Sequence, residues 1–427
     1  MTTAGGAVAE PDVPRAPLPA NVKALGIVSM LGDVASEMIY PLLPLFLTGT
    51  LGASATFIGA VEGVADATSS LLKLASGWWT DRAGRRKPLV VGGYLMSAIA
   101  RPLVGIAAYP WHVLAVRVSD RTGKGIRTSP RDALLADSVQ AAQRGRAYGL
   151  HRALDNVGAV LGPVVAWLLY EMMHVEMRSV FLWSAVPGLL SIVVLMAFVR
   201  EGVRGSGGSG RGGGNTGTAG DAGAGVETIA ANAGAGPGQR ADMPMAPLSP
   251  ALWRYLGVLF LFTLGASTDA FLLIRAQQLG VPVALIPILY AALNLVKALS
   301  STPGGALSDR YGRRPVIIAG WLIYAAVYLG LAAADSAWQV WPLFVVYGLF
   351  FGLTEGTEKA FVADLAPSSR RGAAFGWYNF AVGIATLPAS LMFGAVWDAW
   401  GPRAAFSLGA AIAAVASVGL VTLVPRR

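Results

Sequence analysis

Residues 77–86 read Gly-Trp-Trp-Thr-Asp-Arg-Ala-Gly-Arg-Arg, and residues 305–314 read Gly-Ala-Leu-Ser-Asp-Arg-Tyr-Gly-Arg-Arg. The two stretches share the pattern Gly-x-x-x-Asp-Arg-x-Gly-Arg-Arg and begin 228 residues apart. Each lies between two long apolar runs, which places it at a short loop between helices. The first Gly allows close helix packing, and the second permits a tight turn. The pattern therefore predicts two equivalent helix–loop–helix units.

A second pair of stretches repeats at almost the same spacing. Residues 136–149 contain Ala-Asp, then Arg-Gly, then Gly, and residues 363–376 contain the same residues 227 positions later. Two separate matches at nearly one offset indicate that the chain consists of two homologous halves. Transporters are commonly built from such repeats, with the substrate bound between them.

The composition is that of a membrane protein. Of the 427 residues, 54% are apolar and only 13% are charged, whereas a soluble domain has about 25% charged residues. Because backbone groups in lipid must be bonded within the segment, these apolar runs are expected to be helices. We predict an all-α integral membrane protein with twelve transmembrane helices in two pseudo-symmetric six-helix bundles. The expected spans are 24–47, 56–78, 89–108, 112–139, 147–170, 179–199, 252–274, 282–304, 316–334, 338–364, 373–396 and 403–424.

A Gly-rich segment separates the two halves. Fifteen of the 40 residues from Glu201 to Arg240 are Gly, and such a segment buries nothing. The expected organisation is a disordered cytoplasmic tail, an N-terminal bundle, a flexible cytoplasmic linker and a C-terminal bundle, at residues 1–23, 24–200, 201–250 and 251–427.

The positive charges fix the expected orientation. With the N-terminus inside, cytoplasmic segments hold 20 of the 33 Lys and Arg residues, whereas the outer segments hold Arg178, Arg275 and Arg403. This asymmetry places both termini in the cytoplasm. It also explains the net charge of +9 without a nucleic-acid partner. The expected location is the plasma membrane, which is the inner membrane if the source is a Gram-negative bacterium.

The two Asp-Arg-x-Gly-Arg-Arg loops resemble the loop signature of the major facilitator superfamily, and the resemblance covers essentially the whole chain. It implies a secondary transporter that carries a small-molecule solute across the lipid bilayer by alternating access. The loop Asp can accept bonds from an Arg across one end of the bundle, so the loops form the expected conformational latch. Its residues are Gly77, Asp81, Arg82, Gly84, Arg85, Gly305, Asp309, Arg310, Gly312 and Arg313.

Two further stretches are similar to motifs of this family. Residues 158–163 read Gly-Ala-Val-Leu-Gly-Pro and resemble the antiporter motif, although Ala166 and Trp167 replace its trailing Gly pair. Arg121, followed by Lys124 and Gly125, resembles the buried-Arg motif, with Lys124 where a neutral residue is usual. The first similarity implies proton antiport and efflux, and the second implies a part for Arg121 in proton coupling.

The fourth expected span is exceptionally charged. Its five bases are Arg117, Arg121, Lys124, Arg127 and Arg131. An unpaired charge within a membrane costs at least about 2.5–3.5 kcal/mol on insertion scales. These bases must therefore face acids, water or substrate.

Three interpretations of these charges remain open. They form structural salt bridges with acids on neighbouring helices, they bind protons, or they bind substrate. Burial favours a protonated carboxyl group and a nearby Arg favours an ionised one, so a helix movement would bind or release a proton. The candidates for proton coupling are Asp33, Glu37, Glu62, Asp66 and Arg121. The candidates for substrate binding are Tyr40, Lys124, Arg127, Asp155, Asp269, Asn294 and Glu355, with Lys124 and Arg127 holding an anionic group.

Other classes of function are less well supported. The chain has no phosphate-binding loop for ATP, and with three His and no Cys it offers no soft-metal site. No nucleophile–base set indicates an enzyme, and we expect no cofactor, no metal and a monomer. The sequence predicts a proton-coupled exporter of a small anionic or zwitterionic organic solute. The alternatives are an importer of a metal complex, siderophore or metabolite, and a membrane sensor that transports nothing.

Overall fold

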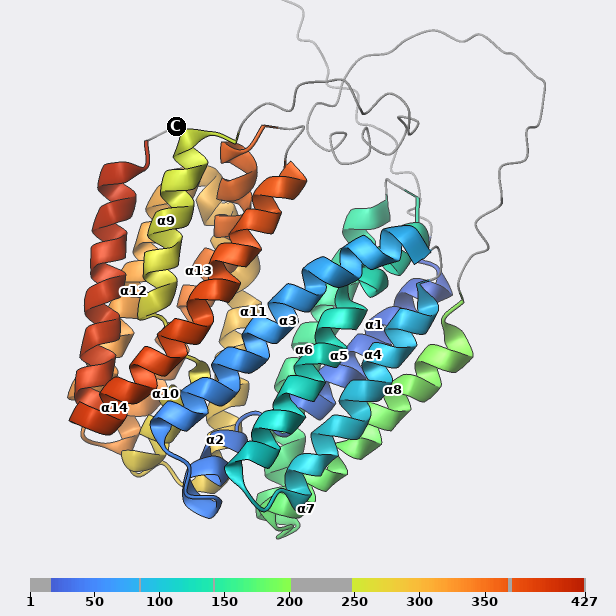
Figure 1. The fold of residues 1–427 in the computed structure, drawn as a ribbon, viewed down its shortest axis with the longest axis horizontal. Coiled ribbons are helices and arrows are strands. Elements are labelled where there is room, and N and C mark those ends of the chain that lie inside the picture. The colour runs from blue at the N-terminus through green and yellow to red at the C-terminus, as the bar shows by residue number, and fades with distance from the viewer. Residues whose placement is uncertain (1–16, 84–85, 141–142, 201–247, 368–370, 426–427) are drawn as a thin grey trace, which may run out of the picture.

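The computed structural model describes residues 17–83, 86–140, 143–200, 248–367 and 371–425. Within these ranges no β-strand is present, and nearly every residue belongs to a helix. The helices gather into two groups that follow each other in the chain (Figure 1). The expected tail and linker fall mainly on residues 1–16 and 201–247, which lie outside the described residues.

In the N-terminal group, several helices continue into a short π- or 3-10 helix. Its elements are α1 (Ala20–Glu37), α2 (Leu43–Leu45), the π-helix Phe46–Thr50, α3 (Ala55–Ala83), α4 (Lys87–Ala100), the 3-10 helix Arg101–Ile106, α5 (Pro110–Asp137), α6 (Arg144–Trp167), the π-helix Leu168–Met172, α7 (Met177–Trp183) and α8 (Ala185–Phe198). Helix α1 packs on α6 and α8, and α5 packs on α3 and α4.

The C-terminal group repeats this plan. Its elements are α9 (Pro250–Gly265), α10 (Asp269–Gln278), the 3-10 helix Val283–Leu285, α11 (Ile286–Tyr311), α12 (Arg313–Ala333), α13 (Ala337–Leu365) and α14 (Arg371–Leu423). Helix α13 packs on α11 and α12, and α14 packs on α9 and α12.

Glycine sets two of the sharp turns. Gly312 has φ +93° where α11 ends and α12 begins, and Gly401 has φ +82° inside α14. A side chain is strained in this conformation, which glycine adopts freely. The turn at Gly401 makes α14 run back on itself, so that it contributes two passes through the bundle (Figure 1). The tight turn expected in the second loop is therefore present at Gly312.

The described helices have the length and composition of membrane spans. Eight helical segments are long and apolar enough to cross a membrane, and one of them is Ala374–Leu423, which contains the two passes of α14. The remaining long helices are α1, α3 and α5, which carry the charges that the sequence placed inside the membrane. With these three, the described chain holds twelve long helices, as expected.

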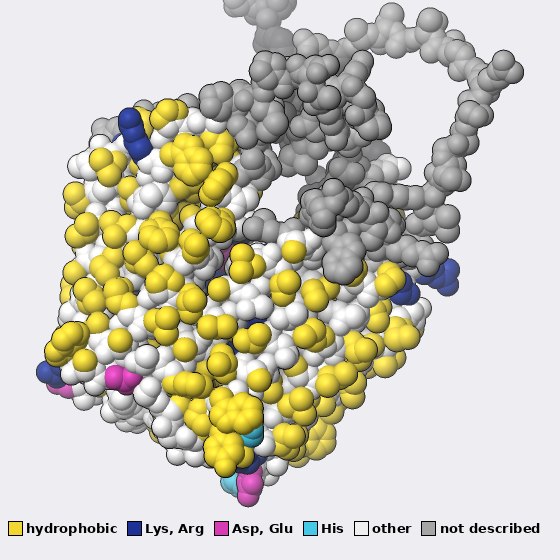
Figure 2. Space-filling model, viewed as in Figure 1, with side chains coloured by type: hydrophobic (Ala, Val, Ile, Leu, Met, Phe, Trp, Pro, Cys, Tyr) yellow, Lys and Arg dark blue, Asp and Glu magenta, His cyan; other side chains and the backbone are white. Residues whose placement is uncertain are grey.

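The outer surface is apolar along most of its height. Hydrophobic side chains cover the visible face of both halves, and the visible charged side chains lie mostly near its two ends (Figure 2). Helix α8 shows this clearly, since Val193, Met196 and Phe198 are all more than half exposed. A surface of this kind faces lipid rather than water.

The two halves meet more closely at one end than at the other. We call the end where residues 200 and 248 lie the linker end, and the opposite end the far end. The ribbons of the two halves diverge toward the linker end (Figure 1). At the far end the Asp398 carboxylate of α14 accepts bonds from the backbone N–H groups of Ala55 and Thr56, at 2.9 and 2.8 Å. The C-terminal half therefore caps helix α3 of the N-terminal half.

Small residues bring α3 and α14 into contact. A Cβ added at Gly394 would lie 2.6 Å from the Ala55 carbonyl oxygen, and one added at Gly63 would lie 2.9 Å from a Leu387 methyl carbon. Gly59 also abuts the backbone of Ser390. The close approach of these backbones is the packing expected of membrane helices, where small residues replace hydrophobic driving force.

Candidate transport site

A cavity of about 350 Å³ lies at the boundary between the two halves. Eighteen of its twenty lining residues belong to the C-terminal half, and only Tyr40 and Asp66 come from the N-terminal half. Seven of the lining residues are aromatic: Tyr40, Phe262, Tyr324, Tyr347, Phe350, Phe351 and Tyr378. The volume and the mixture of aromatic and charged residues are those of a small-molecule site.

Glu355 is the most strongly paired acid of this cavity. Its carboxylate lies 3.5 Å from the Nζ atoms of both Lys297 and Lys359, and it forms an ion pair with Arg152 of the N-terminal half. The group is one acid among three bases, and Glu355 and Lys297 both line the cavity. The Arg152 contact joins α6 to α13 across the boundary.

Two other acids of the cavity have hydrogen bonds but no ion pair with a described base. The Tyr347 hydroxyl donates to Asp269 Oδ1 at 2.9 Å. Glu358 accepts from the Trp321 indole N–H at 2.9 Å and from the Tyr378 hydroxyl at 3.2 Å. Its side chain is buried. The C-terminal side of the cavity is therefore acidic and aromatic.

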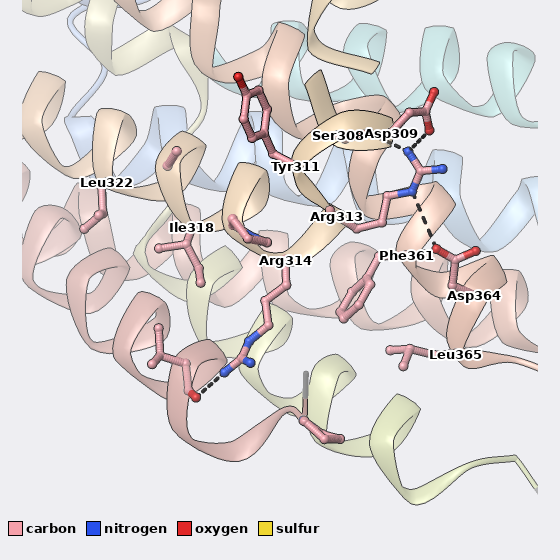
Figure 3. Close-up of a pocket in the computed structure, with 15 residues that line it drawn as sticks. Ser308, Asp309, Tyr311, Arg313, Arg314, Ile318, Leu322, Phe361, Asp364 and Leu365 are labelled. Atoms are coloured by element: carbon pink, nitrogen blue, oxygen red, sulfur yellow. Dashed lines mark hydrogen bonds and ion pairs between the residues drawn. The ribbon is translucent and has the colours of Figure 1, made fainter. Parts of the chain in front are cut away.

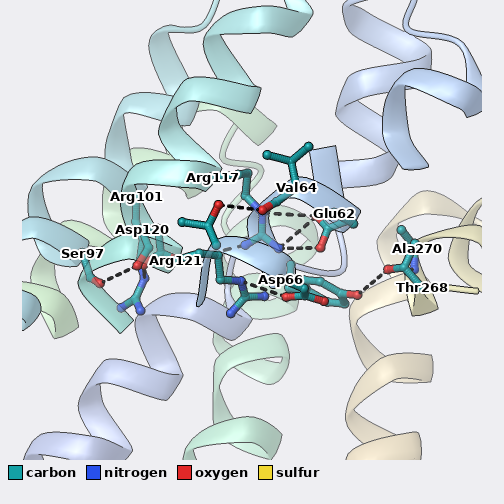
Figure 4. A network of polar contacts seen from close by, with 12 residues as sticks. Glu62, Val64, Asp66, Ser97, Arg101, Arg117, Asp120, Arg121, Thr268 and Ala270 are labelled. Atoms are coloured by element: carbon teal, nitrogen blue, oxygen red, sulfur yellow. Dashed lines mark hydrogen bonds and ion pairs between the residues drawn. The ribbon is translucent and has the colours of Figure 1, made fainter. Parts of the chain in front are cut away.

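Asp66 connects the cavity to the charges of the N-terminal half. Its carboxylate lines the cavity, is 43% exposed, and lies 3.5 Å from the Nε atom of Arg121, which is only 12% exposed. Tyr40 links the same region to the other half, because its hydroxyl lies 3.3 Å from the Thr268 hydroxyl oxygen (Figure 4). Asp66 thus touches both the cavity and a buried base.

The other bases of α5 near this point have structural partners. The Arg117 guanidinium donates to both oxygens of Glu62, at 2.9 and 2.7 Å, and both side chains are almost fully buried. Asp120 lies 2.9 Å from Arg101 and 4.0 Å from Arg117. These residues form one network across α3, α5 and the 3-10 helix that follows α4 (Figure 4). The interpretation as salt bridges thus describes Glu62 well, although its part in proton coupling stays a prediction.

Three further acids of the N-terminal half, Asp33, Glu37 and Asp155, lie between α1, α5 and α6. Asp33 interacts electrostatically with Lys124 and with the carboxyl group of Asp155. Glu37 interacts with Asp33 and Lys124, and its buried Oε2 atom has no hydrogen-bond partner among the described residues. Asp155 also lies 3.4 Å from the Nδ1 atom of His151. Lys124 therefore faces acids of α1, and none of these groups lines the described cavity.

Arg127 contacts different partners from the other bases of α5. It donates to the Ser97 hydroxyl at 2.7 Å, and its guanidinium carbon lies 4.2 Å from the centre of the Tyr94 ring. Since it is 3% exposed and packs on α4, it is far better placed for structure than for direct contact with a solute. Its assignment to substrate binding remains an untested prediction.

The antiporter-like stretch packs directly on the acids of α1. A Cβ added at Gly162 would lie 2.7 Å from the Glu37 Cβ atom, and one added at Gly158 would lie 3.0 Å from the Asp33 Cβ atom. The two glycines therefore let α6 touch α1 at these two acids. The motif does not line the cavity, but it contacts α1 through these glycines and the C-terminal half through the Ala159 carbonyl, which accepts from Asn294.

The second loop forms a charged cluster at the linker end. Arg313 forms an ion pair with Asp309 and lies 3.5 Å from Asp364, and it donates to the Ser308 hydroxyl at 2.6 Å (Figure 3). Arg314 donates to the backbone carbonyl of Leu420 at 3.1 Å. These residues line a second cavity, of about 790 Å³, between α11, α12, α13 and α14. The cluster lies within one half, and it joins the loop to α13.

The rest of the expected latch is only partly described. Arg310 lies with its guanidinium carbon 5.4 Å from the Tyr311 ring centre, and a Cβ added at Gly305 would meet nothing within 4 Å. Gly84 and Arg85 lie outside the described residues. Gly77, Asp81 and Arg82 belong to α3, but their surroundings lie outside what the structure describes. In the first half the pairing of Arg86 with Asp137 is described.

The structure thus divides the expected substrate-binding residues. Tyr40, Asp269 and Glu355 line the cavity, together with Asp66 from the proton-coupling set. Asn294 lies at the boundary, where its amide donates to the Ala159 carbonyl of the other half at 3.3 Å. The prediction missed Glu358 and its aromatic neighbours. A visible signal was the group of charges at positions 355, 358 and 359, which follows a long apolar stretch of the same helix.

Comparisons with known proteins agree with this architecture. The sequence model of the Major Facilitator Superfamily matches residues 25–274 and 255–427. An uncharacterized MFS-type transporter of Methanocaldococcus jannaschii is 32% identical over 407 residues, which cover 94% of each chain. Multidrug resistance protein MdtH of Escherichia coli is 31% identical over 144 residues, which cover 34% of this chain and 36% of that protein.

Solved structures show the same fold. The nucleoside transporter NupG has a TM-score of 0.71 and 14% identity, covering 95% of this chain and 99% of that one. A bacterial homologue of the human lysosomal transporter Spinster, in an inward-facing and unoccupied conformation, has a TM-score of 0.71 and 18% identity, covering 96% of both chains. The expected fold class is therefore confirmed, and the chain belongs to the major facilitator superfamily of membrane transporters for small-molecule solutes.

Proposed function

We propose that the protein is a proton-coupled secondary transporter that exports a small organic solute across the plasma membrane. The observation that carries this proposal is the position of Asp66, which lines the cavity while pairing with the buried Arg121. A carboxylate in that place can be neutralised either by a proton or by contact with a solute and a base. Proton binding and solute binding would then compete at one group, which is the requirement for exchange.

The contacts between the halves suit alternating access. At the far end they include the backbone of α3 bound by Asp398, and on the linker side of the cavity they include the Arg152–Glu355 pair. Hydrogen bonds and ion pairs of this kind can break and reform without damage to either bundle. Rocking of one half against the other would expose the cavity at each end in turn.

Orientation and direction rest on separate arguments. The loops at the linker end are rich in Arg, including Arg310, Arg313 and Arg314, and the positive-inside rule supports a cytoplasmic position for this end. Export is supported by the antiporter-like packing of Gly158 and Gly162 on Asp33 and Glu37. The partial similarity to a multidrug resistance protein also supports export.

The charges around the cavity favour a zwitterionic solute. Lys297 lines the cavity and can hold an acidic group, while Asp269 and Glu358 can hold a basic one. A purely anionic solute would meet four carboxylates on the lining, from Asp66, Asp269, Glu355 and Glu358. Of the two expected substrate classes, the zwitterion is the one that this lining suits.

Everted membrane vesicles can test the proposal. Respiration acidifies the interior of the vesicles, and this acidification quenches the fluorescence of acridine orange. A solute that exchanges for protons then restores the fluorescence. We expect recovery with members of a panel of amines, amino acids and carboxylates in wild-type vesicles, and little recovery with Asp66→Asn. The matched control is Asp132→Asn, since Asp132 is 42% exposed and pairs with Arg131 at 2.9 Å but lies outside the cavity lining.

Two results would contradict the proposal. Transport of a panel solute that is unaffected when the pH gradient is collapsed would exclude proton coupling. Solute accumulation driven in the same direction as the proton flux would show uptake, and the importer of a metabolite or metal complex would then be the correct class.

A further inference from the structure

We propose that the C-terminal wall of the cavity is a binding site for a protonated amine attached to an aromatic body. The proposed site places the ammonium group at Glu358, beside the Tyr378 ring; Trp321 donates to Glu358 but does not line the cavity. Asp269 and Tyr347 belong to the same wall about 16 Å further along α13, because 11 residues separate Tyr347 from Glu358. It rests on the proposed transport function, because it assigns one end of the transported solute to a defined place. Its chemistry follows from the balance of charge, the hydrogen bonds and the rings.

The charge balance leaves two carboxylates available. Among the acids that line the cavity, Asp66 is paired with Arg121, and Glu355 is paired with three bases. Asp269 and Glu358 form no ion pair with a described base, and the bases that act on them electrostatically, Lys297 and Lys359, both pair with Glu355. A carboxylate in a low-dielectric site interacts strongly with any cation that reaches it. An ammonium group would supply the missing positive charge.

The hydrogen bonds hold Glu358 in a fixed position. One carboxylate oxygen accepts from the Trp321 indole and the other from the Tyr378 hydroxyl. Trp321 is completely buried, and its ring stacks on Phe262 at a centroid distance of 4.3 Å. Each oxygen of the carboxylate keeps further lone pairs for a ligand. A fixed carboxylate supported by neighbouring donors is a preorganised acceptor, which binds without losing side-chain freedom.

The rings provide the second element of recognition. Phe262, Tyr324, Tyr347, Phe350 and Tyr378 all line the same cavity as Glu358. Tyr347 stacks near Phe350, with 5.8 Å between ring centres, and it also donates to Asp269. Aromatic faces attract cations and also pack against flat apolar groups. Ring faces beside the Glu358 carboxylate, which has no ion-pair partner within the described residues, select an amine that carries an aromatic group.

Three indole compounds of one shape can test this site on purified protein. Tryptamine carries only the ammonium group, tryptophan carries both charges, and indole-3-propionate carries only the carboxylate. In isothermal titration of the detergent-solubilised protein, we expect saturable binding of tryptamine and tryptophan, each at least about tenfold tighter than indole-3-propionate, as expected for a charge-assisted hydrogen bond. Binding needs no proton gradient, so this measurement is independent of the transport assay.

Glu358→Gln tests the assigned residue without removing its shape. A glutamine side chain can still accept from the Trp321 indole and donate to the Tyr378 hydroxyl, so the core should remain packed. We expect this variant to bind tryptamine and tryptophan about tenfold or more weakly than the wild type does. Its affinity for indole-3-propionate should be unchanged or higher. Asp269→Asn should also weaken the binding of tryptamine and tryptophan. Glu176→Gln, at an exposed position before α7, is the matched control and should bind as the wild type does.

The possible results separate the two proposals. Amine binding that depends on Glu358, in a protein that shows no proton exchange, would support the site and reject proton coupling. The site itself would be overturned if tryptamine failed to bind, if indole-3-propionate bound most tightly, or if Glu358→Gln and Asp269→Asn bound tryptamine as well as Glu176→Gln does.

Discussion

Arg152 of α6 forms an ion pair with Glu355 of α13, and this pair joins the two halves of the transporter beside the cavity. On its own side of the boundary, Glu355 also lies 3.5 Å from Lys297 and from Lys359. When the halves separate, Glu355 can therefore lose Arg152 and remain neutralised by the two Lys residues. The contact can open without leaving a bare charge behind.

Arg152→Gln should change the conformational balance more than the stability. Because the Arg152 side chain is 59% exposed, the loss in free energy of unfolding should be below about 1 kcal/mol. The linker end should open wider, since the pair lies on that side of the cavity. The chain has no Cys, so spin labels can be placed at Tyr148→Cys and Tyr311→Cys and their separation measured by pulsed electron paramagnetic resonance. An unchanged distance distribution, equal to that of the exposed-Arg control Arg254→Gln, would show that the pair has no conformational role.

The buried pair of Glu62 and Arg117 should behave in the opposite way. Both side chains are about 5% exposed or less, so Arg117→Met leaves an uncompensated carboxylate and should destabilise the protein by about 3–5 kcal/mol. The double variant Glu62→Gln with Arg117→Met should recover most of this loss. Thermal unfolding in detergent measures both effects. Additive losses in the double variant would indicate that the two residues act independently.

Gly162→Ala should impair transport through packing. The added methyl group would lie 2.7 Å from the Glu37 Cβ atom and 2.8 Å from the Val34 carbonyl oxygen, and overpacking of this kind costs about 1–3 kcal/mol. The matched control is Gly149→Ala in the same helix, where an added Cβ meets nothing within 4 Å. Vesicle transport assays should show a loss for the first variant and none for the second. Equal activity of the two variants would mean that α1 and α6 have room to adjust.

Asp398→Ala should loosen the far end. The substitution removes the acceptor of the Ala55 and Thr56 N–H groups and of the Thr56 hydroxyl, which donates at 2.6 Å. Loss of a helix cap costs about 0.5–2 kcal/mol of stability. Here the loss destabilises the conformation in which the far end is closed. Spin labels at Trp111→Cys and Trp338→Cys, both exposed positions, should report a population with a longer separation. If labelled wild type and variant give the same distribution, the cap does not control opening.

The repeated loops made the architecture predictable from sequence. They contain residues whose preferences are local: Gly312 can adopt the positive φ that ends α11 without strain, and the Arg residues beside it favour the end of a membrane span. Long apolar segments then determine the helices almost independently of each other. For this reason the two-bundle fold was confirmed, and the expected helix boundaries mostly fall within a few residues of those observed.

The composition of the cavity was harder to predict because it depends on packing among helices. The sequence showed that the bases of the fourth span need acids, water or substrate as partners, but not that Arg121 meets Asp66 while Lys124 meets acids of α1. Glu358 and its donors come from α12, α13 and α14. Their meeting depends on how three helices cross, which hydrophobic periodicity does not encode.

The cap that Asp398 provides has a consequence for biosynthesis. The acceptor and the Ala55 amide are separated by 343 positions, so a ribosome has made almost the entire polypeptide before the start of α3 acquires this partner. Until then the N-terminal bundle sits in the bilayer with one helix end bonded only to water or headgroups. The amides of Ala55 and Thr56 should become protected from hydrogen exchange only when the C-terminal bundle docks, which makes them a natural reporter of the last step of assembly.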